Sequence, residues 1–539
     1  MLPRDALRRA RSSAALALPI LLSLAATAVA ELRGQPADII VTGARVWTGD
    51  TLHPWAEAIA VRGARIIAAG GAAAVDRHRG AETRVVDARG QFVAPGFIDN
   101  HTHFSQAGAL LVGANLLDVS DETALARRVR EARDRLPRGA WLVGGDWGAY
   151  EAWGRGSTGR DSAVSSPGSG FRPHRGMLDS LTPDTPALLS KWDRSLYLAN
   201  GRALALAGAR CDWDGVDCDA GVPTGRLTSA AAARVRAVIP SKPMEQRLSE
   251  ARAALAQLRE LGVTTIHDNT SAEQLAVFQE LRRRGELTVR VYARPTLDKW
   301  RELRAVGIRH GFGDDWIRIG GLKGFVDGIM GNSSARFYEP YLTTGVRGSW
   351  RDSTNTGATG GPGSGMEPAG NMEHLIRGAD SSGHWPQVHA IGDEAIDTLL
   401  TLYERVINEN PARERRLRVI HTQVIRGADV ARRMARLGVI AEVQPYHAID
   451  DMRWMEERIG RDRSRWAYAF RTLRDAGVML TFGSDWPGTN ASWYTASPML
   501  GIYAAVTRQT PDGKPEGGWF PEERVDLETA LRAYTANGA

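Results

Sequence analysis

The 539-residue sequence has few cysteines, few lysines and no long apolar run beyond its N-terminus. Its only cysteines, Cys211 and Cys218, allow at most one intramolecular disulfide. In an oxidising compartment they can close a small loop, and two free or solvent-facing thiols are the alternative. Basic residues are dispersed, without a long run or interleaved aromatic residues, which excludes the pattern of a nucleic-acid-binding protein.

Lysine is much rarer than arginine. Lysine and arginine together number 68, and the lysines are Lys191, Lys242, Lys299, Lys323 and Lys514. Because arginine supplies most of the positive charge, a lysine inside an apolar strand pattern is harder to explain as surface charge. Lys323, in Ile319-Gly-Gly-Leu-Lys-Gly-Phe, is such a lysine.

The first 30 residues have the pattern of a secretory signal peptide. Arginines precede an apolar run at 14–26, and Ala28-Val29-Ala30 forms a small-residue cleavage site. The apolar run is too short to span a membrane comfortably, and an uncleaved anchor is the alternative interpretation. We therefore expect cleavage after Ala30 and an exported protein, periplasmic or secreted, with no stable membrane anchor.

The remaining chain shows two successive patterns. Residues 31–94 alternate short β-type runs with Gly and Asp, which predicts the N-terminal part of a small β-sandwich domain. From 95 to 539, apolar β-type runs alternate with helical stretches, which is typical of βαβ units and a parallel sheet. The predicted strands are 97–103, 263–267, 287–293, 316–323, 387–390, 417–422, 439–444 and 478–485. They indicate an α/β fold, a (β/α)8 TIM barrel, with an inserted subdomain at about 139–240 between strands 1 and 2.

The first barrel strand ends in two histidines that are one residue apart, in Gly96-Phe-Ile-Asp-Asn-His101-Thr-His103. Residues i and i+2 of a strand point to the same side. His101 and His103 can therefore direct both imidazoles at one point, as a metal site requires.

Residues able to bind a metal also follow the fourth, fifth, sixth and eighth strands: Lys323, His389, His421 and Asp485. A single histidine at a strand end is more often a structural hydrogen-bonding residue, and a single aspartate before a turn is more often a cap. Barrel active sites, however, lie at the C-terminal ends of the strands, so these residues together predict one site. His267, at the end of the second strand, either orients the substrate or is a buried hydrogen-bonded histidine.

The sequence resembles the amidohydrolase superfamily and, within it, the YtcJ-like amidohydrolase-3 group. The resemblance runs from about Ala37 to the end of the chain. It rests on Pro95-Gly-Phe-Ile-Asp-Asn-His-Thr-His103, Val388-His-Ala-Ile-Gly-Asp393, Val443-Gln-Pro445 and Phe482-Gly-Ser-Asp-Trp-Pro487.

This resemblance implies a site for two metal ions. His101, His103 and Asp485 hold one ion, His389 and His421 hold the second, and Lys323 bridges both as an N-carboxylated lysine. Two Zn²⁺ ions suit these ligands, with iron or manganese as alternatives. A metal-bridging hydroxide attacks a carbonyl or amidine carbon, and Asp485 acts as general base and then general acid. His267 is the second residue with an implied catalytic role.

The implied activity is hydrolysis of a non-peptide C–N bond in an amide, N-formyl or cyclic amide compound. A mononuclear-metal deaminase of the same superfamily is one alternative, and a truncated, non-catalytic exported protein is another. We expect a small-molecule substrate as the partner and no nucleic acid, with a homodimer left open. The sequence identifies no substrate-binding residue.

The sequence departs from the group at three places. Ile420 precedes His421 where the group usually carries Glu, and Arg194 stands where many members carry His. Relatives continue beyond the point that corresponds to Ala539, so we expect the C-terminal return to the β-sandwich to be missing.

Overall fold

The computed structural model describes residues 36–539, except 118, 120, 137–138, 148–172, 192–193, 352–364, 367–369 and 489–495. The predicted signal peptide at 1–30 therefore lies outside the described residues. The chain divides into two compact units, Met1–Pro95 and Gly96–Ala539. Within the described part of the chain, no helix is both long and apolar enough to cross a membrane.

The described residues of the first unit form two small sheets, with orders β5-β4-β1-β6 and β3-β2-β7. The elements are β1 (Ile39–Thr42), β2 (Arg45–Trp47), β3 (Trp55–Ala56), β4 (Ala58–Arg62), β5 (Arg65–Gly70), α2 (Ala72–Asp76), β6 (Arg84–Asp87) and β7 (Phe92–Val93). Alternation along β1 and β4 buries Ile40, Ala58 and Ala60, which pack in one cluster with Val75 of α2.

Parallel strands of the second unit lie in two sheets, with orders β16-β15-β14-β8 and β17-β18-β19-β20-β21. They are β8 (Phe97–Thr102), β14 (Val263–Asn269), β15 (Arg290–Arg294), β16 (Ile317–Ile319), β17 (Leu322–Phe325), β18 (Pro386–Ala390), β19 (Arg418–His421), β20 (Ile440–Val443) and β21 (Leu480–Phe482). Isolated parallel bridges join Thr102 to Trp486 and Thr296 to Lys323. The α/β class predicted from the alternating pattern is confirmed.

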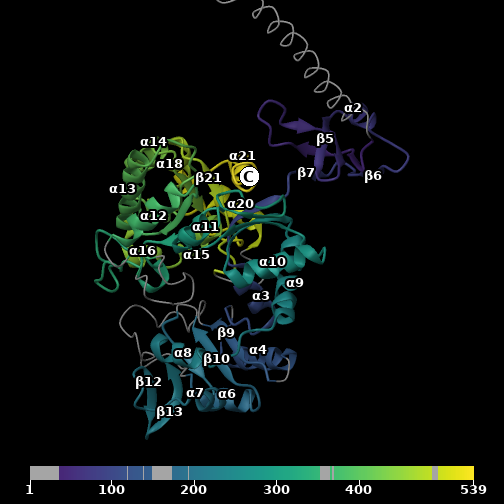
Figure 1. The fold of residues 1–539 in the computed structure, drawn as a ribbon. Coiled ribbons are helices and arrows are strands. Elements are labelled where there is room, and N and C mark those ends of the chain that lie inside the picture. The colour runs from purple at the N-terminus through teal and green to yellow at the C-terminus, as the bar shows by residue number, and fades with distance from the viewer. Residues whose placement is uncertain are drawn as a thin grey trace, which may run out of the picture. The chain divides into compact units, whose positions relative to one another are not determined.

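Helices follow most of these strands and supply the apolar layer against them. They are α3 (Phe104–Val112), α9 (Met244–Glu260), α10 (Ala272–Arg283), α11 (Trp300–Ala305), α12 (Asn371–Ser381), α13 (Asp393–Glu409), α14 (Ala428–Arg436), α15 (Pro445–Asp451), α16 (Met455–Ile459), α17 (Arg461–Ser464), α18 (Phe470–Asp475), α20 (Pro498–Thr507) and α21 (Leu527–Ala533). Short 3₁₀ turns occur at Leu297–Lys299, Met330–Asn332 and Pro521–Glu523. In α9, helical spacing places Leu248, Leu255 and Leu258 in one core with Ile266 of β14 and Phe278 of α10. Figure 1 shows α13 and α14 side by side at the left edge of the second unit.

The predicted strand at 316–323 is interrupted. Gly320 and Gly321 separate β16 from β17. Neither position has room for a side chain, because a Cβ at Gly320 would lie 2.1 Å from the ring of Tyr292 and one at Gly321 would lie 2.4 Å from the side chain of Gln387. The backbone passes close to both side chains here, and this close passage positions Lys323 in β17.

The insertion between β8 and β14 contains a mixed five-stranded sheet of order β12-β13-β11-β10-β9. Its elements are α4 (Glu122–Arg135), β9 (Leu142–Trp147), α6 (Arg175–Leu181), β10 (Ala187–Lys191), β11 (Tyr197–Ala199), α7 (Gly201–Ala207), β12 (Val216–Asp219), β13 (Val222–Leu227) and α8 (Ser229–Arg236). Helix α4 precedes the predicted boundary at 139, yet its Leu125 and Val129 pack in one core with Leu189 of β10.

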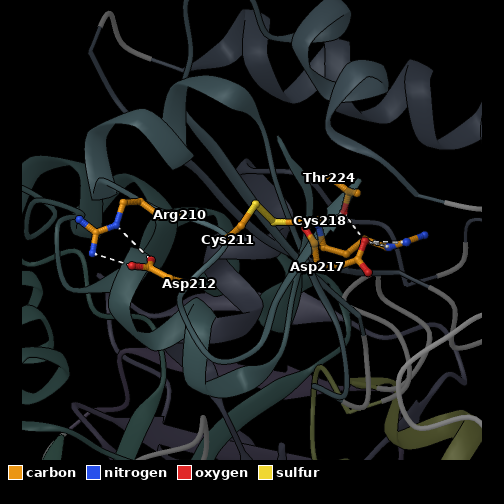
Figure 2. Close-up of a disulfide and its surroundings, with 7 residues drawn as sticks. Arg210, Cys211, Asp212, Asp217, Cys218 and Thr224 are labelled. Carbon is orange, nitrogen blue, oxygen red and sulfur yellow. Dashed lines mark hydrogen bonds and ion pairs between the residues drawn. A yellow bond between two sulfur atoms is a disulfide. The ribbon is translucent and has the colours of Figure 1, made fainter. Parts of the chain in front are cut away.

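Cys211 and Cys218 form a disulfide beside the β12–β13 hairpin, which decides between the two alternatives that the sequence left open. Figure 2 shows the disulfide between two polar pairs, with Arg210 donating to Asp212 on one side and Thr224 donating to Asp217 on the other. The disulfide links the segment before β12 to β12 itself.

Candidate metal centre

The six predicted ligands lie in or just after five of the parallel strands. His101 is in β8 and His103 follows it, while Asp485 comes three residues after the end of β21. His103 Nε2 lies 3.1 Å and His101 Nε2 lies 3.3 Å from Asp485 Oδ1. Potential ligand atoms of these three residues all lie within 4.8 Å of one another, close enough for one metal ion to bind them together.

The remaining three residues lie against this group. The ring of His421, at the end of β19, is 5.2 Å from that of His101 and 4.5 Å from that of His389, in β18. Lys323 Nζ lies 4.7 Å from the ring centre of Phe325, whose ring is 5.5 Å from that of His389. The fold therefore brings together residues that are as far apart in sequence as His101 and Asp485.

Three of the histidines are oriented by hydrogen-bonding partners at one ring nitrogen. His101 Nδ1 lies 2.7 Å from Glu442, His421 Nδ1 lies 2.8 Å from Gln444 Oε1, and His389 Nε2 lies 2.8 Å from the carbonyl of Gly328. Metal-binding histidines typically donate their other ring N–H to such acceptors. The arrangement leaves one nitrogen of each ring available as a ligand.

Two buried atoms of the predicted ligands lack a hydrogen-bond partner among the described residues: His101 Nε2 and Lys323 Nζ. His101 Nε2 is near Asp485 but lacks the geometry of a hydrogen bond to it. Because buried polar atoms are nearly always paired, orphaned nitrogens in one cluster point to a missing partner. A divalent metal, and a carboxylated Lys323, fit these residues.

Burial determines the charges of this site. It lowers the pKa of His101 to about 3, with an added contribution from the positive charge of Lys323. It also lowers the pKa of Lys323 to about 7, assisted by Arg294. For Asp485 burial alone would raise the pKa, but His101 and His103 outweigh it and hold the pKa well below the usual value. A neutral imidazole at His101 and an ionised carboxylate at Asp485 are protonation states that bind a cation.

Two of the ligands sit on unusual backbone. His421 has φ +75°, Thr422 has φ +42° and Asp485 has φ +57°, although none of them is a glycine. Asp485 is held there by its own N–H, which donates to the carbonyl of His101 at 2.8 Å. Non-glycine residues in this region of φ are concentrated at functional sites.

A buried charge network that the sequence did not predict lies beside the centre. Glu442 accepts from Arg294 at 2.9 Å and from Arg418 at 2.8 Å, in addition to its contact with His101. Arg418 also approaches His267 Nδ1 at 3.3 Å, and the His267 ring stacks on Tyr292 at 4.3 Å. These contacts describe a buried, hydrogen-bonded His267, and its role in orienting a substrate stays a prediction.

His447 is a further residue near the centre that was not predicted from the sequence. It lies in α15, which begins at Pro445 of the Val443-Gln-Pro445 motif. Its Nε2 is buried and has no hydrogen-bond partner in the part of the chain that the structure describes. A Cβ built on Gly488 would lie 3.4 Å from this nitrogen and 3.5 Å from Asp485 Oδ2, so both atoms border the same small space.

Arg194, the residue that departs from the group pattern, pairs with Asp146 of the inserted sheet. Its guanidinium donates to both carboxylate oxygens of Asp146 and to the hydroxyl of Ser190. Asp146 in turn accepts from Gln106 at 3.1 Å, and Gln106 lies in α3, three residues after His103. Asp146, which Arg194 holds, thus links the inserted sheet to the helix that follows the His-x-His strand.

The chain is similar to several known proteins. Residues 84–539 match the Amidohydro_3 family model, described as "Amidohydrolase family". Protein LONG AFTER FAR-RED 3 of Arabidopsis thaliana is 30% identical over 94% of this chain and 84% of its own length. N-substituted formamide deformylase of Arthrobacter pascens is 25% identical over 94% of this chain and 89% of its own length.

A solved structure shares the fold. It is titled an uncharacterized metal-dependent hydrolase from Pyrococcus furiosus, and it covers 93% of this chain and 94% of its own. The TM-score is 0.69, at 25% sequence identity. The described residues therefore share the fold of that protein.

Proposed function

The chain belongs to the amidohydrolase family, and from this premise we propose that it hydrolyses a non-peptide carbon–nitrogen bond. The substrate class is an amide, N-formyl or cyclic amide compound. A relative named N-substituted formamide deformylase supports the N-formyl member of this class.

The proposal assigns two divalent metal ions to the centre, zinc first, with iron or manganese as alternatives. His101, His103 and Asp485 hold one ion, His389 and His421 hold the other, and a carboxylated Lys323 bridges them. When bound, the pair of ions activates a water molecule and polarises the scissile carbonyl. The observation that carries the proposal is the clustering of two orphaned buried nitrogens, His101 Nε2 and Lys323 Nζ.

Asp485 is the proposed general base and acid. Its carboxylate is ionised because its pKa is held well below the usual value, so it can accept the proton of the attacking water. With 19% of its side chain exposed, it is reachable from solvent. It then returns that proton to the leaving amine, which departs neutral.

The proposal includes closure of the parallel strands into a (β/α)8 barrel and a β-sandwich arrangement for the first unit. Isolated parallel bridges at Thr102–Trp486 and Thr296–Lys323 support closure, because they occur at both junctions between the two open sheets. Barrel closure would bring the C-terminal strand ends into one ring, where barrel enzymes carry their chemistry.

A hydrolysis screen tests the function. Metal-replete protein is incubated with matched amide, N-formyl and cyclic amide compounds, and released amine is measured. We expect turnover in at least one class and its loss in D485N, which keeps the shape of the side chain but cannot act as a base. No turnover in any class and no bound metal would overturn the proposal.

Metal analysis tests the two-ion arrangement separately. Elemental analysis of protein never exposed to chelator should give two metals per chain, and K323A should lose activity together with one of them. Full activity of K323A with a single metal would instead favour a mononuclear deaminase of the same superfamily.

We also propose export. The signal-peptide pattern at 1–30 and a disulfide between Cys211 and Cys218 support an oxidising compartment outside the cytosol. Expression with the native leader, followed by N-terminal sequencing of the protein in the extracytoplasmic fraction, should give Glu31 as the first residue. Intact Met1 in a cytosolic fraction would contradict this.

A further inference from the structure

One buried carboxylate beside the candidate metal centre is shared by a histidine and two arginines. Glu442, in β20, is completely buried, as is Arg294 from β15, and 7% of the Arg418 side chain is exposed. Glu442 Oε1 lies 2.7 Å from His101 Nδ1 and 2.9 Å from Arg294. Its Oε2 accepts from Arg418 at 2.8 Å and from Arg294 at 3.1 Å.

The two arginines leave Glu442 little freedom to move. Arg294 also donates to the carbonyl of His267 at 3.0 Å, and Arg418 also donates to Asn100 Oδ1 at 3.2 Å. Arg294 is therefore bonded to the backbone of β14, and Arg418 to a side chain of β8, while both hold the carboxylate. A buried carboxylate that faces two guanidiniums stays ionised, because burying it uncharged would leave both cations unpaired.

Two different groups face His101 Nδ1, and they favour opposite tautomers. Ionised Glu442 can only accept a hydrogen bond, so it requires hydrogen on Nδ1. Arg294 approaches the same nitrogen at 3.3 Å and can only donate, so it requires a lone pair there. Glu442 is the closer of the two, at 2.7 Å, and a charge-assisted bond of that length is the stronger one.

We propose that Glu442 is a positioning residue that keeps the hydrogen of His101 on Nδ1 and thereby presents the lone pair of Nε2 to the metal. The inference rests on the proposed metal-dependent function. Without Glu442, the facing Arg294 would draw the lone pair to Nδ1 and place hydrogen on Nε2. His101 would then be unable to bind a metal even if its ring had not moved.

The variant E442Q tests this with little change in shape. A glutamine amide can donate to Nδ1, so it permits the tautomer that the carboxylate forbids. We expect zinc binding, measured by competition with a chromophoric chelator, to weaken by about 10- to 100-fold, the usual effect of removing such a partner. E442D keeps the charge and should restore most of the affinity.

The chain contains a matched control for the loss of a buried carboxylate. Asp380 is also fully buried, and it accepts from Arg413 at 2.7 Å and from Arg415 at 2.9 Å. Among the described residues, its hydrogen bonds go to Asn410, Arg413 and Arg415, none of which is a candidate ligand. D380N should therefore lose stability as E442Q does and yet bind zinc as the wild type does. If D380N and E442Q weaken zinc binding equally, Glu442 has only a structural role and the inference is wrong.

A readout without metal separates this inference from the proposed function. In metal-free wild-type protein labelled with ¹⁵N-histidine, the His101 signals, assigned by their loss in H101N, should show hydrogen on Nδ1 and a lone pair on Nε2. Hydrogen on Nε2 in the wild type would overturn the inference even if E442Q fails to fold. If the wild type shows the expected tautomer but binds no metal, the proposed function fails and the positioning of His101 stands.

Discussion

Among single residues, Lys323 is one whose chemistry changes on burial. Its pKa of about 7, against an ordinary value of 10.5, makes it a neutral amine in slightly alkaline solution. Only the neutral amine reacts with carbon dioxide, forming an N–C bond and releasing one proton. The neutral fraction, and with it carboxylation, should rise as the pH increases through about 7.

This pH dependence can be measured by incorporation of ¹³C-bicarbonate into metal-free protein, followed by ¹³C NMR. Between pH 6 and pH 8 the neutral fraction of a group with a pKa near 7 rises roughly tenfold, and the carbamate signal should rise with it. K323A should give no such signal at either pH. Equal incorporation at both pH values would show that Lys323 does not limit the reaction.

His447 should matter for catalysis rather than for metal binding. Its orphaned Nε2 shares a small space with the carboxylate of Asp485, where the leaving group would be protonated. We expect H447N to lower kcat by about 10²- to 10⁴-fold, as for loss of a proton-transfer group, while metal content stays unchanged. H53N, at an exposed position in the first unit, should leave kcat unaltered. A loss of metal from H447N would instead indicate a ligand.

The sequence predicted the residues at strand ends and missed those that support them. His101, His389 and Asp485 follow apolar runs, so their places at the ends of predicted strands identify them. The partner of His101, Glu442, is 341 residues away, and no local pattern encodes that pairing. In the pairing of β19 with β20, Glu442 lies opposite Ile420. Ile420 is the position at which the resembling group usually carries Glu. That Glu442 places a carboxylate opposite this position can be recognised only once the register of the two strands is known.

At the scale of elements, strand positions were predictable and strand continuity was not. The pattern at 263–267 corresponds to β14 (Val263–Asn269) and that at 387–390 to β18 (Pro386–Ala390). The strand predicted at 316–323 is divided at Gly320 and Gly321, where Tyr292 and Gln387 occupy the space that side chains would need. Such an interruption depends on neighbouring strands, which sequence periodicity does not describe.

Substitution of Gly392, which follows β18, tests how tightly the turn after this strand holds His389 in place. A Cβ at Gly392 would lie 1.9 Å from the backbone carbonyl of Arg336, which cannot rotate away. Asp327 fixes the same turn by accepting from the N–H groups of Ile391, Gly392 and Arg336. We expect G392A to destabilise the protein by at least about 1–3 kcal/mol, as overpacking does, and to reduce metal content by displacing His389.

Thermal unfolding and elemental analysis check this expectation. G71A is a suitable control, because a Cβ there meets nothing closer than 3.8 Å and the backbone φ of −64° suits alanine. G71A should match the wild type in both measurements. Wild-type stability in G392A would mean that the segment around Arg336 shifts freely, and the turn would then not hold His389 in place.

At the scale of the whole molecule, the candidate ligands join distant parts of the second unit. They come from β8, β17, β18 and β19 and from the segment after β21, so bound metal would connect residues from His101 to Asp485. The second unit also has apolar cores of its own, such as that formed by Leu258, Ile266 and Phe278. We therefore expect the fold to persist without metal and to become more stable when metal binds.

The increase in the free energy of unfolding on metal binding can be calculated. A ligand that binds only the folded state at 100 times its dissociation constant adds about 2.7 kcal/mol to the free energy of unfolding. Urea unfolding of the wild type, with chelator and with buffered zinc, should show that difference, and far-UV circular dichroism should show the same folded spectrum in both.

H103N should respond much less to zinc, because His103 Nε2 lies 3.1 Å from Asp485 Oδ1 and shares the proposed ion. D380N, whose carboxylate pairs with Arg413 and Arg415 outside the ligand set, should keep the full response despite its lower stability. Wild-type protein that contains zinc could instead show an unfolding curve that zinc does not change. The unfolded chain would then bind zinc with the same affinity as the folded chain, and the ligand geometry would contribute nothing to that affinity.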